Sequence, residues 1–155
     1  MNQPPLPVFR REILVPAEAL DSNGHVNNVV YLRWIQDSAV EHARATGGAH
    51  AARAVSGLWV VRRHEIDYLH PAFEGDRLLS LTWVVRFRKA RSFRRHQLIR
   101  LPDHVLIARG ESQYAFVDAH TGRPRPVPET VADCFTPLGT GEDPSANAFA
   151  PHLLE

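Results

Sequence analysis

Hydrophobic and polar positions follow a helical period in only one long segment of the chain. Between residues 27 and 46, charged side chains recur at intervals of four, four and three, and apolar side chains cover the other faces. This spacing is typical of an α-helix. So wide an apolar surface predicts a helix enclosed by protein on most sides, and Gly47 and Gly48 predict its end.

The remaining pattern is that of strands. Residues 77–88 alternate most clearly, with Leu79, Leu81, Trp83, Val85 and Phe87 on one face. Polar side chains dominate the other face, which predicts a half-buried antiparallel strand. Further strands are predicted at residues 10–15, 55–68, 92–101 and 105–117. We expect only strands after the helix.

The order of these elements predicts an α+β fold. One strand, one long helix and four strands joined by short links form an antiparallel sheet of five or more strands with the helix across its concave face. We expect a single domain at residues 9–135, after an N-terminal extension at residues 1–8. Residues 136–155 mix Gly, Pro, Ala and Asp without a period, which predicts a loosely ordered tail.

Composition narrows the class of protein further. Lys and Arg number 18 against 17 Asp and Glu, and this balance argues against a surface that is basic throughout, as in many nucleic-acid binders. No apolar run is long enough to cross a bilayer. The N-terminal residues lack the apolar region of a secretion signal, so we expect a cytoplasmic protein. The single Cys134 is expected to be a packing residue.

No metal site is expected. His64, Glu65 and Asp67 lie on one predicted strand, where His64 faces one side and the two acids face the other. Neither this group nor His96 and His104 has the spacing of zinc ligands.

The loop before the helix concentrates polar side chains. It reads Asp-Ser-Asn-Gly-His-Val-Asn-Asn at residues 21–28. Asp21, Asn23 or Asn27 could cap the helix, with Gly24 supplying a backbone conformation that other residues disfavour. Alternatively, the N–H groups and positive dipole of the helix start could stabilise an oxyanion, with Asp21 as base or nucleophile.

The loop motif, followed by the helix and by Tyr-Leu-His-Pro-Ala-Phe-Glu-Gly-Asp at residues 68–76, resembles the hotdog-fold thioesterases. It is most similar to the group of 4-hydroxybenzoyl-CoA and bacterial acyl-CoA thioesterases, and the loop is also similar to that of plant acyl-ACP thioesterases. The resemblance covers residues 9–130. It implies a hotdog fold, in which one long helix is wrapped by the sheet.

The resemblance also implies site residues. Asp21 falls on the catalytic aspartate, and the backbone N–H of Asn28 falls on the group facing the thioester oxygen. Asn23 and His25 match catalytic positions of the plant enzymes. The expected substrate-binding residues are Gly24, Asn27, Tyr31 and Trp34.

A basic cluster surrounds one predicted hairpin. It comprises Arg86, Arg88, Lys89, Arg91, Arg94 and Arg95. Such a cluster can be solvated surface, a phosphate clamp for coenzyme A or a contact for nucleic acid. The resemblance favours coenzyme A, with Arg88, Lys89, Arg91, Ser92 and Arg94 as the binding residues.

The resemblance implies assembly too. The plant enzymes complete their site with a second fused repeat, which this chain lacks. We therefore expect a homodimer, or a dimer of dimers, with active sites between subunits.

The sequence thus predicts an acyl-CoA thioesterase that needs no cofactor beyond the coenzyme A of its substrate and binds neither metal, membrane nor nucleic acid. Two alternatives remain for Asp21, which acts either as a base or as a nucleophile. The alternatives are an acyl-ACP thioesterase, a non-catalytic acyl-CoA or acyl-carrier binder, a nucleic-acid-associated protein and a dehydratase acting on acyl thioesters.

Overall fold

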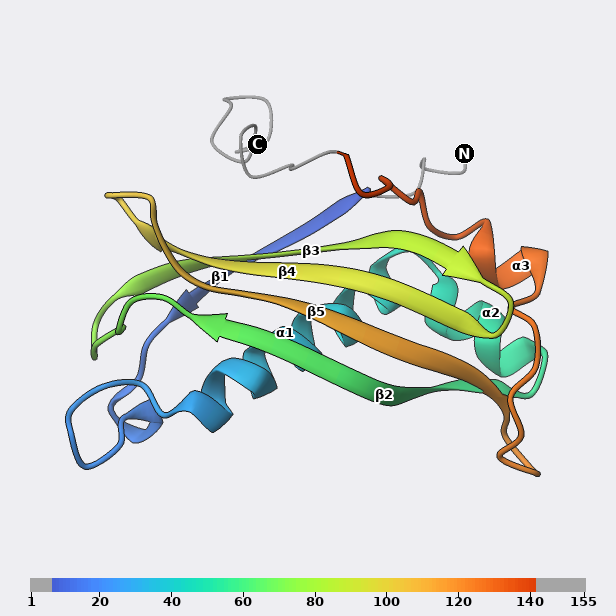
Figure 1. Ribbon diagram of the computed structural model, residues 1–155, viewed down its shortest axis with the longest axis horizontal. Coiled ribbons are helices and arrows are strands. Elements are labelled where there is room, and N and C mark those ends of the chain that lie inside the picture. The colour runs from blue at the N-terminus through green and yellow to red at the C-terminus, as the bar shows by residue number, and fades with distance from the viewer. Residues whose placement is uncertain (1–6, 142–155) are drawn as a thin grey trace.

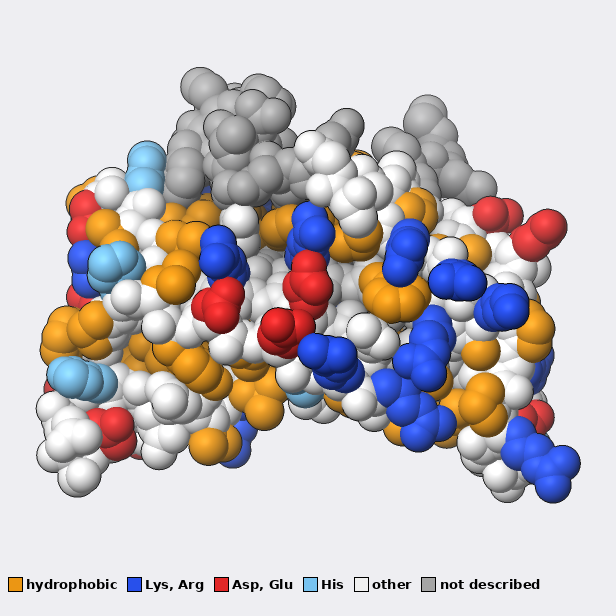
Figure 2. Space-filling model, viewed as in Figure 1, with side chains coloured by type: hydrophobic (Ala, Val, Ile, Leu, Met, Phe, Trp, Pro, Cys, Tyr) orange, Lys and Arg blue, Asp and Glu red, His pale blue; other side chains and the backbone are white. Residues whose placement is uncertain are grey.

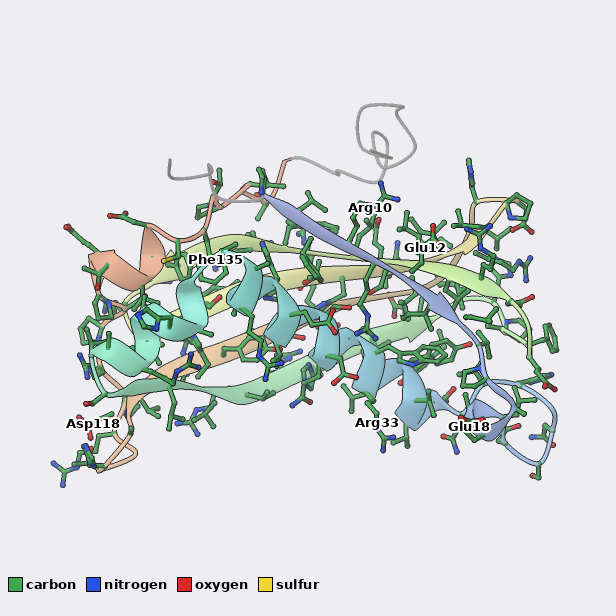
Figure 3. All side chains as sticks on the ribbon, turned by 180° about the vertical axis from the view of Figure 1, so that it is seen from behind. Arg10, Glu12, Glu18, Arg33, Asp118 and Phe135 are labelled. Carbon is green, nitrogen blue, oxygen red and sulfur yellow. The ribbon has the colours of Figure 1, made fainter. Side chains whose placement is uncertain are left out.

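A computed structural model describes residues 7–141 and contains one antiparallel sheet crossed by one long helix (Figure 1). The strands are β1 (Val8–Leu14), β2 (Gly57–Tyr68), β3 (Arg77–Arg88), β4 (Arg91–Leu101) and β5 (Val105–Asp118). The helices are η1 (Ala17–Ala19), α1 (Asn28–Ala45), α2 (Gly48–Ala54) and α3 (Glu129–Ala132). The strand order is β1-β3-β4-β5-β2, so β1 and β2 form the edges. The view from behind shows α1 lying across one face of this sheet (Figure 3).

The long helix forms where it is predicted, but the expectation that only strands follow it is wrong. Gly47 adopts a φ of +85°, which ends α1, and α2 starts at the next residue. The segment Gly-Ala-His-Ala-Ala-Arg-Ala is rich in strong helix formers. At Gly48 a Cβ atom would meet the ring of Phe135, so the absence of a side chain there lets α2 pack closely against the end of the domain.

Strand β3 has the predicted bounds, yet its half-buried character is corrected. Every residue from 78 to 85 is buried, because both faces of the strand are covered. The more polar face lies beneath α1, where the hydroxyls of Ser38 and Ser80 are 2.8 Å apart. A register shift between Val84 and Arg86 also moves Phe87 off the predicted apolar face, because a bulge changes the alternation that follows it.

The main hydrophobic core lies between α1 and the sheet. Helix α1 contributes Tyr31, Trp34 and Ile35, and the strands contribute residues including Leu78, Leu98 and Ile107. A second apolar cluster lies on the opposite face of the sheet, around Leu81 and Trp83. Burial of these side chains on both faces fixes the sheet relative to α1.

The first residues after the predicted domain boundary pack on the sheet. The N–H groups of Leu138 and Gly139 donate to the carbonyls of Val84 and Val85, which continues the edge of β3 beyond β1. Part of the segment 136–141, which was predicted to belong to a loosely ordered tail, is therefore hydrogen-bonded to the sheet. Residues 1–6 and 142–155 lie outside the described part of the chain, together with the expectations made for them.

Candidate active site

The loop before α1 folds around the carboxylate of Asp21. The Oδ1 atom of Asp21 accepts the N–H of Asn23 at 2.9 Å and that of His25 at 3.3 Å. Gly24 closes the turn with a φ of +79°, a conformation that side chains disfavour. One carboxylate oxygen thus holds the loop, whereas Oδ2 makes no hydrogen bond to the described residues.

Asn27 caps the helix. Its Oδ1 atom accepts the N–H of Val29 at 3.0 Å, which is the geometry of an N-cap. The N–H of Asn28 has no hydrogen-bond acceptor among residues 7–141. It therefore remains available at the positive end of the helix dipole.

A cleft of about 210 Å³ opens beside this helix start. Its lining comes from the loop and α1 at Asp21, His25, Val26, Asn28 and Tyr31, and from residues 68–71 at the end of β2. The hydroxyl of Tyr68 donates to the carbonyl of Asn28 at 3.3 Å, and the hydroxyl of Tyr31 accepts the N–H of Ala72 at 3.1 Å. Burial raises the pKa of Tyr31, so its phenol is neutral at pH 7.

Four of the expected site residues line this cleft and four do not. The cleft includes Asp21, His25, Asn28 and Tyr31, but Asn23, Gly24, Asn27 and Trp34 are absent from its lining. Trp34 is buried in the core, with its ring centroid 5.7 Å from that of Tyr31. Because Trp34 faces the sheet rather than the cleft, its expected contact with substrate is corrected to a packing role.

Sequence reasoning missed the wall formed by residues 68–71. These residues belong to the second motif, which carried the resemblance but was assigned no role in the site. The signal was their Tyr-Leu-His-Pro sequence at the end of a predicted strand. Backbone hydrogen bonds place them, since the N–H groups of Leu69 and His70 both donate to the carbonyl of Ile107.

The basic hairpin joins β3 to β4 and lies at the other end of the sheet from the loop that precedes α1 (Figure 1). Strand β3 runs from Arg77, at the cleft end, to Arg88, a span of about 35 Å at the usual rise per residue. Arg86, Arg88, Lys89 and Arg91 are exposed there. Figure 2 shows Lys and Arg side chains gathered over this end of the sheet. Within one chain, these cations and Asp21 do not form a common site.

Ser92 and Arg94 are not surface residues. Both are only 5% exposed, because they point from β4 towards α1. Arg94 contacts the imidazole Nδ1 of His42 at 2.8 Å and donates to Thr82 Oγ1 at 3.1 Å. Burial lowers the pKa of Arg94 to about 10, so the guanidinium is still charged at pH 7. Neither residue can serve as an exposed phosphate contact in this structure, which corrects that expectation.

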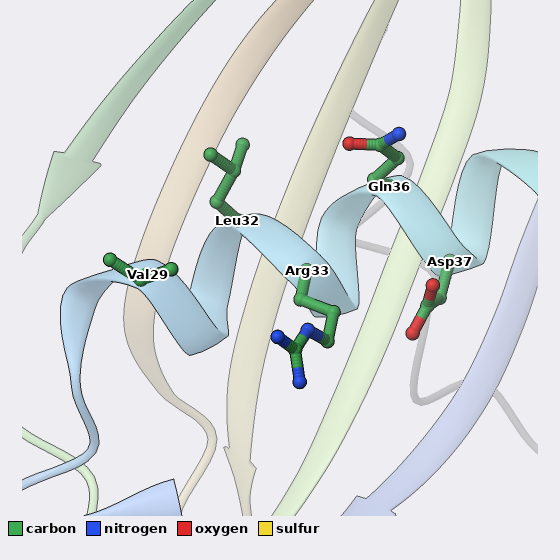
Figure 4. Close-up of a pocket in the computed structure, with 5 residues that line it drawn as sticks. All are labelled: Val29, Leu32, Arg33, Gln36 and Asp37. Atoms are coloured by element: carbon green, nitrogen blue, oxygen red, sulfur yellow. The ribbon is translucent and has the colours of Figure 1, made fainter.

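A second hollow, of about 380 Å³, lies on the outer side of α1 (Figure 4). Five residues of the helix line it: Val29, Leu32, Arg33, Gln36 and Asp37. Leu32 and Gln36 point to the opposite side of the helix from Arg33 and Asp37. Val29, at the start of this helix, is 64% exposed.

Two negative findings concern the described residues alone. Residues 7–141 contain no group of three or more His, Cys, Asp or Glu side chains arranged to bind a metal ion. None of the helices formed by these residues combines the length and apolar character needed to cross a membrane.

Solved structures of other proteins share this fold. YbaW from Escherichia coli, described as a probable thioesterase, has a TM-score of 0.76 and 19% identity over 81% of this chain and 95% of its own. A 1,4-dihydroxy-2-naphthoyl-CoA thioesterase from Synechocystis has a TM-score of 0.73 and 17% identity over 82% and 94%. The 12:0-ACP thioesterase of Umbellularia californica has a TM-score of 0.76 and 16% identity over 88% of this chain and 53% of its own.

These similarities establish the fold, and the sequence establishes the family. The family model of the thioesterase-like superfamily matches residues 15–135, which include the loop, α1 and all strands from β2 to β5. The predicted α+β hotdog fold is confirmed. The chain belongs to the thioesterase-like superfamily, and this membership supports hydrolysis of a thioester as its reaction class.

Proposed function

We propose that the protein hydrolyses acyl-CoA thioesters to a free carboxylic acid and coenzyme A. The observation that carries the proposal is the convergence of Asp21 and the backbone of Asn28 on one cleft at the start of α1. A thioester carbonyl directed at the Asn28 N–H would develop its negative charge where the helix dipole stabilises it. In one route, the Oδ2 atom of Asp21 attacks the carbonyl carbon, the C–S bond breaks to release the coenzyme A thiolate, and water hydrolyses the resulting mixed anhydride. In the other, Oδ2 accepts a proton from a water that attacks the carbonyl carbon, and the C–S bond breaks in the same way.

We propose further that the active unit is a homodimer. Strand β2 is an edge of the sheet, and its backbone can pair with a second copy. Leu58, Tyr68 and Leu69, on and just after β2, are exposed although apolar or aromatic. A two-fold axis with antiparallel β2 strands would bring the start of the partner's β2, and hence its hairpin end, towards the Asp21 end of this chain.

This assembly supplies the coenzyme A contact that one chain lacks. Arg88, Lys89 and Arg91 of the partner subunit would then bind the phosphates of the nucleotide. Their exposure and their positive charge support this role. Because the 12:0-ACP thioesterase shares the fold, a carrier-protein thioester is the second candidate substrate.

The test measures thiol release from short, medium, long and aromatic acyl-CoAs, and from acyl-ACP, with wild-type protein and Asp21→Asn. Asparagine keeps an Oδ1 acceptor for the two loop N–H groups but cannot act as base or nucleophile. We expect a loss in kcat of about 10²-fold or more in Asp21→Asn. Asp37→Asn, on the outer side of α1, is the matched control.

Other outcomes separate the alternatives. Equal activity of wild type and Asp21→Asn would remove Asp21 from the mechanism. Tight binding of acyl-CoA without thiol release in any sample would indicate a non-catalytic binder. In single turnover in ¹⁸O-labelled water, label in the Asp21 carboxylate would identify direct attack and exclude pure base catalysis.

A further inference from the structure

A row of three side chains leads away from the cleft along β2. Tyr68, Ile66 and His64 alternate with outward-facing residues, so all three point to the α1 side of the sheet. Tyr68 belongs to the cleft and contacts the backbone of Asn28. At the usual strand rise, His64 lies about 13 Å from Tyr68.

Helix α1 borders this row. Glu41 pairs with Arg11 of β1 at 2.9 Å, so that side of the helix faces β1. Leu32 and Gln36 lie on the opposite side by helical geometry, and therefore on the side of β2. An acyl chain that starts at the Asn28 N–H and follows β2 would pass Ile66 and Leu32 before it meets His64.

His64 is held in place by two buried residues. Its Nδ1 atom lies 2.7 Å from Ser112 Oγ, and the same hydroxyl lies 3.0 Å from His96 Nε2. Ser112 and His96 are each 2% exposed, whereas His64 is half-buried. The hydrogen bond to Ser112 orients the His64 ring by its Nδ1 atom, so the Nε2 atom is directed away from Ser112.

The single hydroxyl proton of Ser112 can satisfy only one of the two imidazoles. Burial, with the positive charge of Arg94 as the next cause, lowers the pKa of His96 well below its usual value, so His96 is neutral. His96 Nδ1 is buried without a hydrogen-bond partner among the described residues. At such a buried position, an Nδ1 atom with a lone pair costs less free energy than an Nδ1 atom with an unpaired N–H group.

The position of the proton on His96 determines which ring nitrogen of His64 carries a proton. With a lone pair on Nδ1, His96 carries its proton on Nε2 and donates to Ser112. Ser112 then donates to Nδ1 of His64, which leaves the proton of His64 on Nε2. A half-buried N–H donor, held by hydrogen bonds through Ser112 to His96, thus lies in the row of side chains that begins at the cleft.

We propose that His64 is a specificity-determining residue that binds an oxygen atom near the far end of the acyl group. The proposal rests on the proposed thioesterase function. An extended chain of carbon–carbon bonds of about 1.5 Å advances about 1.3 Å per bond because of its zigzag, so a 13 Å span corresponds to about ten bonds. The preferred substrates are therefore medium-chain acyl thioesters with a terminal hydroxyl or carboxylate oxygen, rather than plain hydrocarbon chains of the same length.

The test compares kcat/KM for decanoyl-CoA, 10-hydroxydecanoyl-CoA and decanedioyl-CoA. Wild type should prefer the two oxygenated substrates about tenfold, the usual scale of one directed hydrogen bond. His64→Leu should abolish this preference by reducing kcat/KM for the oxygenated substrates alone. His64→Gln, whose amide can place a donor near the Nε2 position, should retain part of it.

A matched variant separates specificity from structure. In His64→Asn a polar group stays near Ser112 but the outward donor is lost, so the preference should disappear although the fold is retained, as checked by thermal unfolding. Equal kcat/KM for all three substrates in wild type would overturn the proposal. A uniform reduction for all substrates in every His64 variant would also overturn it and indicate a purely structural role.

A binding measurement keeps this proposal distinct from the proposed function. Non-hydrolysable thioether analogues of the plain and hydroxylated acyl-CoAs bind whether or not the protein is a hydrolase. If no thioester is cleaved, the thioesterase proposal fails by itself. Tighter binding of the hydroxylated analogue by wild type than by His64→Leu would still support the role of His64, and equal binding would refute it.

Discussion

The two ends of the sheet carry complementary chemistry. The cleft end holds a carboxylate and a free backbone N–H at the start of α1, and it is built from a short loop. The hairpin end holds exposed cations on two long strands. The proposed acyl-CoA substrate would use both kinds of group, and within one chain they lie at opposite ends of β3, a strand of about 35 Å. The proposed homodimer would bring the two kinds of group together in one site.

The largest predicted effect comes from mixing subunits. Asp21→Asn and the triple variant Arg88→Ser, Lys89→Ser, Arg91→Ser should each be poorly active at low acyl-CoA concentration. After unfolding and refolding together, half of the dimers combine one chain of each kind and contain one intact site, so about a quarter of the wild-type sites should return. Thiol release measures this recovery. Activity no higher than the parental average would mean that both groups act within one chain.

The second prediction contrasts two arginines of β4. Arg94→Ala should lower the free energy of unfolding by about 2–4 kcal/mol, because it leaves a cavity and removes the donor to His42 and Thr82. Arg94→Met, which replaces the buried charge with an apolar chain, should be less destabilising. Arg91→Met at the exposed hairpin should change stability by less than about 0.5 kcal/mol. Urea unfolding of all three checks this, and equal costs at positions 91 and 94 would contradict it.

The third prediction concerns pH. His96 has a folded-state pKa well below its usual 6.5, chiefly through burial, so the unfolded chain binds a proton that the folded chain excludes. Stability should therefore be at its full value above about pH 6.5 and fall below it, by up to about 1.4 kcal/mol per pH unit for this group. His64, with a pKa lowered by burial, acts in the same direction. A pH series of urea unfolding should show a weaker slope in His96→Gln, and an unchanged slope would contradict this assignment.

The smallest predicted effect is at the cleft end. Asn27→Ala should cost about 1 kcal/mol of unfolding free energy, because it removes the N-cap of α1. Asn23→Ala should cost less than about 0.5 kcal/mol, since its backbone N–H, and not its side chain, bonds to Asp21. Thermal unfolding of the two variants compares them, and a larger cost at Asn23 would contradict the assigned cap.

Much of the fold could be predicted because local patterns carry it. The alternation of residues 77–88 matches β3, and the helical spacing of residues 27–46 matches α1 within one residue at each end. The first strand begins two residues earlier than predicted, and α2 was missed. Its seven residues are too short a segment for a helical period to be recognised beside the preceding glycines.

Candidate site residues could be grouped from the sequence where chemistry and chain position coincide. Asp21, Gly24 and Asn28 lie within eight residues, so one loop could be identified as a unit. The wall at residues 68–71 reaches that loop only through the sheet. Similarly, Arg91 and Arg94 look alike in the sequence, although one is exposed and the other is buried.

The sequence by itself determined the order of the long helix and the five strands, the polar loop before a buried helix and the family, because helical and strand periods and a contiguous motif are local properties. Only the tertiary structure decided which face of β3 lies under α1, that Arg94 is buried beside His42, and that the cationic hairpin is far from the loop before α1. Those facts depend on sheet register, on the bulge in β3 and on the direction of each strand. They arise from contacts between residues distant in the chain, which no local pattern encodes.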